Sequence, residues 1–268
     1  MLNKVKRFTL LGLLVAGTTL AFTGCGTTSQ QNTQTAQAIA SWSETFDGAT
    51  TNFSVSAPPT HAVSMSQATT EMMLQLGLAD KMAGTAFKEE EIYEPLQGEY
   101  DKVKVLAEKW PSYEVFMSVK PDFATGWPDS FSKRAIPADK MIANKVNIWL
   151  PESMLSTKAD LETNFKDMIM LGKIFGVESK ANEWVKAQRD TLTKVQNQLK
   201  DVPRKRVFIY DSEDGQPFTA FEGYTTNILR LIGADNVMSG LGVDKTWAKG
   251  SWETVIAQNP DYIIIADY

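Results

Sequence analysis

The sequence predicts an α/β protein of two similar lobes, each built on a parallel sheet, joined by a long α-helix with a cleft between the lobes. A motif of a Ser-aromatic-Glu triplet, six further residues and a Pro-Asp pair occurs at Ser112–Asp122 and again at Ser251–Asp261. A second pair of similar segments, Thr69–Gly77 and Thr225–Gly233, begins with two threonines and ends in glycine. Both pairs occur in the same order, which indicates an internal duplication, and a cleft between two lobes is a common small-molecule site.

Apolar runs of strand length alternate with helical patterns, which predicts parallel sheets covered by helices on both faces. Gly77 is expected to end the first helix, Ala68–Leu76. In the first half, the expected strands are His61–Ser66, Val103–Leu106, Phe123–Thr125 and Val146–Leu150, and the expected helices are Ala68–Leu76, Val115–Val119 and Asp139–Asn144. In the second half, the expected strands are Arg206–Tyr210 and Tyr262–Ala266.

Residues 157–202 are predicted to form two helices between the lobes. The first is expected at Lys158–Phe175, opened by a capping box of Thr157 and Asp160. The second, Lys180–Leu199, would be a rod of roughly 30 Å at about 1.5 Å per residue. A rod of this length can join two lobes by itself. Because a helical hinge bends less easily than crossing strands, we expect small opening motions.

Residues 1–24 have the order of a secretory signal, with three basic residues, an apolar run and small residues before Cys25. Phe22–Cys25 resembles the lipobox of bacterial lipoproteins, in which the cysteine thiol receives a diacylglyceryl group. We therefore expect an exported protein, periplasmic or on the outer face of the cell membrane, that touches the membrane only through a lipid on Cys25. The alternative is an incidental cysteine in an ordinary signal peptide. As the only cysteine of the chain, it forms no internal disulfide.

Residues 25–50 are expected to form a flexible tether, because Gly26–Ala40 is rich in Thr, Gln, Ser and Asn and has almost no bulky apolar side chain. Removal of residues 1–24 takes away three of the 27 basic residues and none of the 32 acidic ones, which leaves a net charge of −8. Nucleic acid is therefore not an expected partner.

The two lobes are expected at residues 51–156 and 203–268, with the second lobe incomplete. In the second copy of the motif, only eight residues come after Pro260. A strand at Tyr262–Ala266 without a following helix and strand would expose an apolar edge. We therefore expect that the sequence is truncated at its C-terminal end.

Several segments, taken in order, resemble the helical-backbone class of substrate-binding lipoproteins that serve ABC importers of ferric siderophores, haem and cobalamin. The resemblance covers residues 58–268 and is carried by His61–Ser66, Thr70–Gly77, Lys120–Trp127, the two inter-lobe helices, Arg206–Thr219 and Ser251–Asp261. It implies two Rossmann-like lobes and binding of an iron(III)-siderophore chelate, with cobalamin or haem as the alternative ligand. It also implies a monomer that delivers this small-molecule chelate to an ABC permease dimer with its ATPase.

Glu114 and Glu253 match the two glutamates that members of this class use to dock on the permease, one on each lobe. Two carboxylates on similar lobes can pair with arginines of a two-fold symmetric permease. The alternative is that both are solvated acids at helix starts, favoured by the helix dipole, with Ser112 and Ser251 as the caps. Both interpretations can hold together.

The ligand is expected where loops after the strands of the two lobes face each other. Large aromatic rings in these loops suit a macrocycle or a catecholate through stacking, and Trp127 matches a cleft tryptophan of the cobalamin binders. Each tryptophan could instead belong to the core. Arg134, with Lys133, could neutralise an anionic chelate or lie in a solvated turn. The candidate ligand-binding residues are Ser66, Phe87, Trp110, Trp127, Arg134, Tyr224 and Trp247.

Other chemistries find less support in the sequence. His61 is the only histidine, so a histidine-based metal site is not expected, and neither is a resident cofactor. Haem could use Tyr93, Tyr224 or Met65 as an axial ligand. An enzyme is not expected, and the alternative, a secreted hydrolase that depends on a carboxylate pair, would draw on Glu71, Asp211, Glu213, Asp214 and Glu222.

Overall fold

The computed structural model describes residues 37–266. The predicted signal peptide at residues 1–24, Cys25 and the first part of the predicted tether lie outside the described residues. Within them, a five-stranded parallel sheet has the order β5-β4-β3-β6-β7. Its strands are β3 Ala62–Met65, β4 Met82–Ala86, β5 Val105–Ala107, β6 Phe123–Gly126 and β7 Asn147–Trp149.

Helices cover both faces of this sheet, as the sequence predicts. Neighbouring strand residues alternate between the faces: Ala62 and Phe123 pack in one apolar cluster, whereas Val63 and Ala124 pack in the other. The first cluster holds α1 Gln67–Gln75 and α2 Gln97–Tyr100, and the second holds α3 Tyr113–Ser118 and α4 Ala138–Ala143. Short 3₁₀ turns lie at Ala79–Lys81, Glu94–Leu96, Pro128–Phe131 and Glu152–Met154.

An antiparallel hairpin precedes the sheet and corrects the predicted tether. Strands β1 Ala40–Phe46 and β2 Ala49–Val55 pair in register, joined by a two-residue turn at Asp47 and Gly48, both with positive φ, as a hairpin turn of this length favours. The indole Nε1 of Trp42 donates to the carbonyl oxygen of Ile148 at 2.7 Å. The first lobe therefore begins near residue 40 and not at residue 51, because apolar side chains that alternate with Ser and Thr are enough to bury one face of the hairpin.

The two helices predicted between the lobes have different roles. Helix α5, Leu161–Ile174, contributes Phe165, Met168 and Leu171 to the core of the first lobe, so it does not connect the lobes. It also begins later than predicted, because Asp160 is the N-cap and forms a capping box with Thr163 instead of Thr157.

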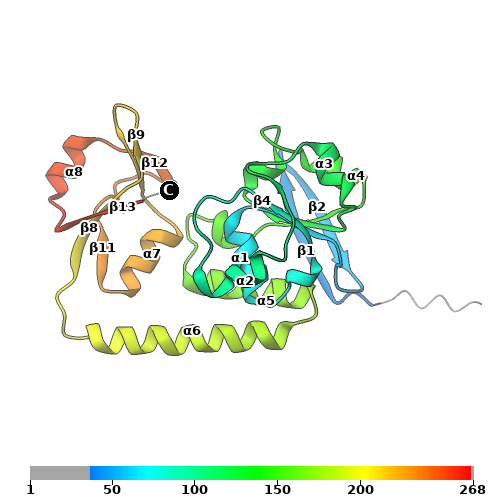
Figure 1. The fold of residues 1–268 in the computed structure, drawn as a ribbon. Coiled ribbons are helices and arrows are strands. Elements are labelled where there is room, and N and C mark those ends of the chain that lie inside the picture. Colours follow the sequence, from blue (N-terminus) through cyan, green and yellow to red (C-terminus); the bar gives the residue numbers. More distant parts are fainter. Residues whose placement is uncertain (1–36, 267–268) are drawn as a thin grey trace, which may run out of the picture. The chain divides into compact units, whose positions relative to one another are not determined.

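Helix α6, Glu178–Leu199, is the connecting rod (Figure 1). Its 22 residues correspond to roughly 33 Å. Only Ala181 and Val185 of this helix are buried, so it is anchored at its N-terminal end. A Cβ at Gly172 of α5 would lie 2.6 Å from the Cβ of Ala181, which shows how closely the two helices approach. No helix within residues 37–266 is both long and apolar enough to cross a membrane.

The second lobe contains a parallel sheet of order β11-β8-β13 and an antiparallel sheet of order β12-β10-β9. The strands are β8 Lys205–Tyr210, β9 Ser212–Glu213, β10 Pro217–Ala220, β11 Ala234–Asn236, β12 Trp247–Lys249 and β13 Tyr262–Ile265, and the helices are α7 Tyr224–Leu231 and α8 Trp252–Gln258. Strands β9, β10, β11 and β12 are not among the strands that the sequence predicts for this lobe.

The duplicated motif has the same structural role in both lobes. In the first lobe, the Asp122 carboxylate accepts a hydrogen bond from the backbone N–H of His61 at 2.9 Å, and the Asp122 N–H donates to the His61 carbonyl at 3.1 Å. In the second lobe, Asp261 exchanges the equivalent pair of hydrogen bonds with Arg206, both at 2.8 Å. Each motif therefore fixes the start of one parallel strand to its neighbour.

Candidate ligand-binding cleft

Segments from both lobes meet at a pocket of about 370 Å³, here called the aromatic pocket. Three residues that the sequence predicts for ligand binding, Trp127, Tyr224 and Trp247, line it together. Its other lining residues are Ala68, Met72, Ser153, Met154, Asn164, Glu222, Thr225 and Thr246. A volume of this size lies within the range of roughly 300–1,000 Å³ typical of small-molecule sites.

Trp127 lies directly after β6, at the carboxyl end of the central strands, where α/β folds place ligands. Its indole Nε1 donates to Oε2 of Glu89 at 3.2 Å, which holds the ring at the edge of the pocket. Burial raises the pKa of the Glu89 carboxyl, and the hydrogen bond from Trp127 opposes this rise.

Tyr224 is the first residue of α7 and follows Gly223, which has a φ of +86°. A Cβ at Gly223 would lie 2.7 Å from the Thr246 methyl carbon, so this close turn requires glycine. Burial, and secondly the charge of Asp167, raise the pKa of the Tyr224 phenol. The phenol therefore stays protonated and can donate a hydrogen bond to a ligand. Trp247 belongs to β12 and stacks on Phe218 with ring centroids 6.2 Å apart.

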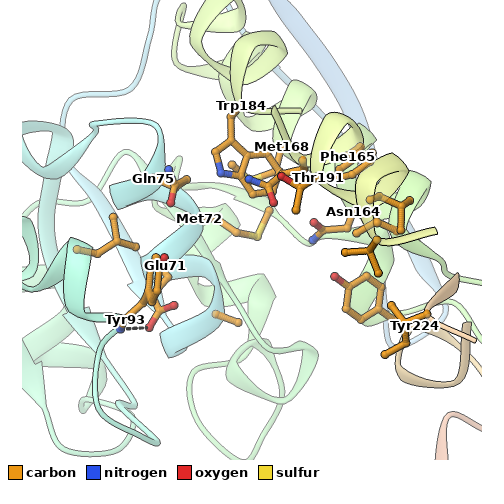
Figure 2. Close-up of a pocket in the computed structure, with 17 residues that line it drawn as sticks. Glu71, Met72, Gln75, Tyr93, Asn164, Phe165, Met168, Trp184, Thr191 and Tyr224 are labelled. Atoms are coloured by element: carbon orange, nitrogen blue, oxygen red, sulfur yellow. Dashed lines mark hydrogen bonds between the residues drawn. The ribbon is translucent and has the colours of Figure 1, made fainter. Parts of the chain in front are cut away.

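A second pocket of about 460 Å³, the helix pocket, lies among α1, α5, α6 and α7. Figure 2 shows Met72 and Gln75 on one side, Trp184 of α6 on another, and Tyr224 opposite them. The helix pocket shares Ala68, Met72, Asn164 and Tyr224 with the aromatic pocket. The two pockets therefore have part of their walls in common.

Two buried carboxylates hold the segment that carries Ser153 and Met154 into the aromatic pocket. Glu44 of β1 accepts from the backbone N–H of Leu150 at 2.9 Å. Asp167 of α5 accepts from the backbone N–H groups of Glu152 at 2.9 Å and Ser153 at 2.8 Å. Burial raises the pKa of Glu44 to about 7 and also raises the pKa of Asp167, and the charge of Asp167 adds to the rise at Glu44.

Sequence reasoning missed these two acids for different reasons. Asp167 lies next to Met168 of the apolar stripe of α5, and a charged residue beside such a stripe is a signal that could have been used. Glu44 lies in a segment rich in Ser and Thr that carries no comparable signal. Ser153, Met154 and Asn164 line the aromatic pocket and were also not predicted.

Four predicted ligand-binding residues do not line either pocket. Ser66 is fully buried as the N-cap of α1, where its hydroxyl accepts from the Thr69 backbone N–H, because the start of a buried helix needs this acceptor. The rings of Phe87 and Trp110 stack on each other at 4.7 Å, and the Trp110 indole donates to the Met65 carbonyl at 3.2 Å. Arg134 forms an ion pair with Asp129, and its side chain is 73% exposed.

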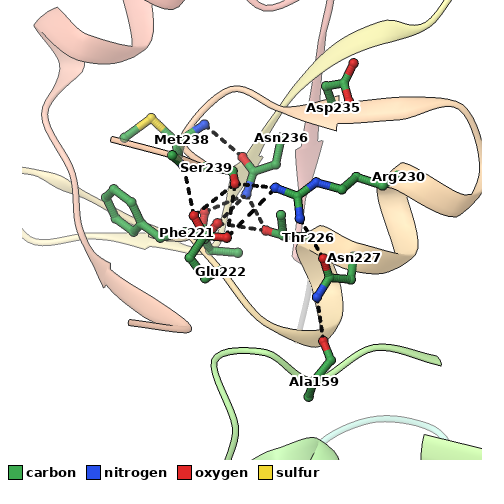
Figure 3. Close-up of polar contacts among 12 residues, drawn as sticks. Ala159, Phe221, Glu222, Thr226, Asn227, Arg230, Asp235, Asn236, Met238 and Ser239 are labelled. Carbon is green, nitrogen blue, oxygen red and sulfur yellow. Dashed lines mark hydrogen bonds and ion pairs between the residues drawn. The ribbon is translucent and has the colours of Figure 1, made fainter. Parts of the chain in front are cut away.

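Glu222 lines the aromatic pocket and is held by a polar network (Figure 3). Its carboxylate accepts from the Ser239 hydroxyl at 2.9 Å and from the Gly240 backbone N–H at 2.8 Å. Arg230 donates to Ser239 at 2.6 Å and lies 3.9 Å from the Glu222 carboxylate. Asn227 on α7 extends the network toward the first lobe by donating to the Ala159 carbonyl at 2.7 Å.

Glu114 and Glu253 occupy equivalent positions in the first turns of α3 and α8. Both are exposed, and neither lines either pocket. Ser112 and Ser251 are the N-caps of the two helices, as the sequence predicts. Hydrogen bonds from its own backbone N–H and from Ser112 lower the pKa of the Glu114 carboxyl. Glu114 is therefore a charged, solvated acid, which is compatible with both interpretations offered by the sequence.

The arrangement is that of a solute-binding protein: two α/β lobes, one connecting helix and aromatic residues from both lobes around a shared pocket. No group of three or more His, Cys, Asp or Glu side chains that could hold a metal ion occurs within residues 37–266. Residues 63–268 match the family described as periplasmic binding protein. The chain therefore belongs to the periplasmic binding protein family.

Individual relatives agree with this assignment. A crystal structure of a periplasmic binding protein from Veillonella parvula DSM 2008 is 84% identical, with a TM-score of 0.85 over 87% of this chain and 78% of that chain. An uncharacterised ABC transporter substrate-binding lipoprotein of Bacillus subtilis (strain 168), YvrC, is 26% identical over 95% of this chain and 79% of its own length.

Two further solved structures share the fold at lower identity. One, of an ABC-type Fe3+-hydroxamate transport system from Saccharomonospora viridis DSM 43017, is 19% identical with a TM-score of 0.68 over 84% of this chain and 79% of that chain. The other, of the vitamin B12 binding protein BtuF of Vibrio cholerae, is 18% identical with a TM-score of 0.61 over 78% of this chain and 77% of that chain.

Proposed function

We propose that this protein binds an iron(III)-siderophore chelate outside the cytoplasmic membrane and delivers it to an ABC import permease with its ATPase. The observation that carries the proposal is the aromatic pocket, in which Trp127 of the first lobe lies with Tyr224 and Trp247 of the second. The name of the Bacillus relative supports an ABC transporter as the partner. Cobalamin and haem are the alternative ligands of the same importer class.

The lining of the pocket suits a bulky ligand with a largely organic surface. Aromatic rings bury such a surface by stacking, while Asn164, Glu222 and the Tyr224 phenol are among the polar groups of the lining that can fix its orientation. Because the rings come from both lobes, a bound ligand brings the lobes together and favours a closed state.

Docking is assigned to Glu114 and Glu253. They present the same group at the same place in two copies of one motif, outside both pockets. A monomer with two such carboxylates matches a permease dimer with two equivalent cationic sites. A lipid on Cys25, which lies outside the described residues, would keep the protein near the permease.

Binding is tested by titrating the purified protein with a ferric hydroxamate, cyanocobalamin and haemin while intrinsic tryptophan fluorescence is recorded. We expect saturable, sub-micromolar binding of the ferric hydroxamate, and loss of this binding in a variant with both Trp127→Ala and Trp247→Ala. Trp252→Phe is the matched control, because Trp252 packs on Tyr210 of the second lobe and lines neither pocket. If only cyanocobalamin or only haemin gave saturable binding, that compound would be assigned as the ligand in place of a siderophore.

A further inference from the structure

The charged side chains that line the two pockets are all acidic. Glu222 lines the aromatic pocket and Glu71 lines the helix pocket. Among residues 37–266, no lysine, arginine or histidine lines either of them. A third carboxylate, that of Glu89, accepts the hydrogen bond from the Trp127 indole at the edge of the aromatic pocket.

Three basic residues that could compensate an anionic ligand, Arg230, Lys249 and Arg134, are engaged with other groups. Among the described ion pairs, Arg230 is the only basic residue that pairs with a carboxylate lining either pocket, and it lies 3.9 Å from Glu222. Its guanidinium donates to the Asn227 side-chain oxygen and to the Ser239 hydroxyl, both at 2.6 Å, on the α7 side of the network (Figure 3). Lys249 pairs with Asp214 at 2.7 Å. Arg134, which the sequence suggested for an anionic chelate, pairs with Asp129.

The aromatic rings favour the same sign of charge as the carboxylates do. The face of an indole or phenol ring attracts a cation through its quadrupole, and the attraction grows when the cation loses its water. An anionic ligand would lie against these rings and the Glu222 carboxylate, and no cation in the lining would compensate its charge. Binding such a ligand costs free energy where water is excluded.

We propose that this site selects chelates without net negative charge and prefers those with a pendant ammonium group, with Glu222 as the specificity-determining residue. The inference rests on the proposed function and narrows it. A neutral or cationic ferric hydroxamate fits the site, whereas a ferric tris-catecholate, with three negative charges, does not.

A series of three ferric chelates tests the selection for charge alone. Ferrioxamine B carries a pendant ammonium, its N-acetyl derivative is neutral, and its N-succinyl derivative carries a carboxylate at the same place. We expect affinity to fall in that order, by about tenfold for each step, as for a unit charge about 12 Å away at an effective dielectric constant of about 20. Equal affinity for the three chelates would overturn the selection for charge and leave the proposed function standing. Failure of all three to bind would overturn the siderophore assignment itself.

Glu222→Gln identifies the residue responsible. The amide keeps an oxygen for the Gly240 N–H and can donate to Ser239, so the network persists without the charge. We expect an approximately tenfold loss of ferrioxamine B affinity, no change for the neutral chelate and a gain for the succinyl chelate. Glu183→Gln, at an exposed position of α6 outside both pockets, should leave all three affinities unchanged. An equal loss for all three chelates in Glu222→Gln would show a merely structural role and refute the assignment.

Discussion

The buried carboxylate of Glu44 should make the stability of this protein fall as the pH rises. Glu44 is 7% exposed, and burial raises its pKa from the usual 4.5 to about 7. The unfolded chain exposes the group and restores the usual value. Because the folded protein holds this proton more tightly, the stabilisation is fully present below pH 4.5 and is lost as the pH rises through about 7.

The size of the effect follows from the size of the shift. At about 1.4 kcal/mol per pH unit, the shift corresponds to a loss of about 3 kcal/mol between acid and mildly alkaline solution. Glu44→Gln removes the ionisation and retains an oxygen to accept the Leu150 N–H. The variant should therefore match the wild type near pH 4.5 and exceed its free energy of unfolding by up to about 3 kcal/mol near pH 8. The melting temperature should then be about 5 to 10 °C higher.

Urea and thermal unfolding of both proteins, followed by circular dichroism over this pH range, measure the difference. Asp167, whose pKa is also raised by burial, is present in both proteins, so its own titration largely cancels in the comparison. Glu183→Gln is the matched control, because this exposed side chain should change stability by no more than about 0.5 kcal/mol at any pH. A Glu44→Gln variant whose stability relative to the wild type is independent of pH, or lower near pH 8, would refute the reasoning.

Three further predictions concern the cleft, the docking surface and one turn. Trp127→Ala should weaken ligand binding by about 1 to 3 kcal/mol in calorimetric titrations. Unchanged affinity together with lowered stability would show that the ring belongs to the core and does not bind ligand. The double variant Glu114→Ala, Glu253→Ala should abolish transport in a cell uptake assay. Its ligand affinity and melting temperature should stay nearly constant, since exposed acids contribute little to stability. Uptake at the wild-type rate would contradict the docking role. Gly223→Ala should lower the free energy of unfolding more than Gly240→Ala does, by about 1 kcal/mol or more. Both glycines have positive φ, but of the two only Gly223 would place its new Cβ within 3 Å of a methyl carbon. Equal losses in the two variants would show that the neighbouring side chain moves aside at little cost.

The sequence by itself determined the elements that depend on local chemistry. The duplicated motif predicted two capped helices, each followed by a parallel strand, and both occur at α3-β6 and α8-β13. The long amphipathic segment predicted α6 almost to the residue. These features are local because a cap, a proline or a helical stripe acts on neighbours within a few residues.

Only the tertiary structure decided which of the predicted residues meet. Trp127, Tyr224 and Trp247 share a pocket, whereas Ser66, with equally suitable chemistry, caps a buried helix. Glu44 is buried because its strand packs against a segment 106 positions away, where it meets Leu150. Burial and the pKa shifts that follow from it are set by the packing of segments distant in sequence, and no local pattern around Glu44 encodes them.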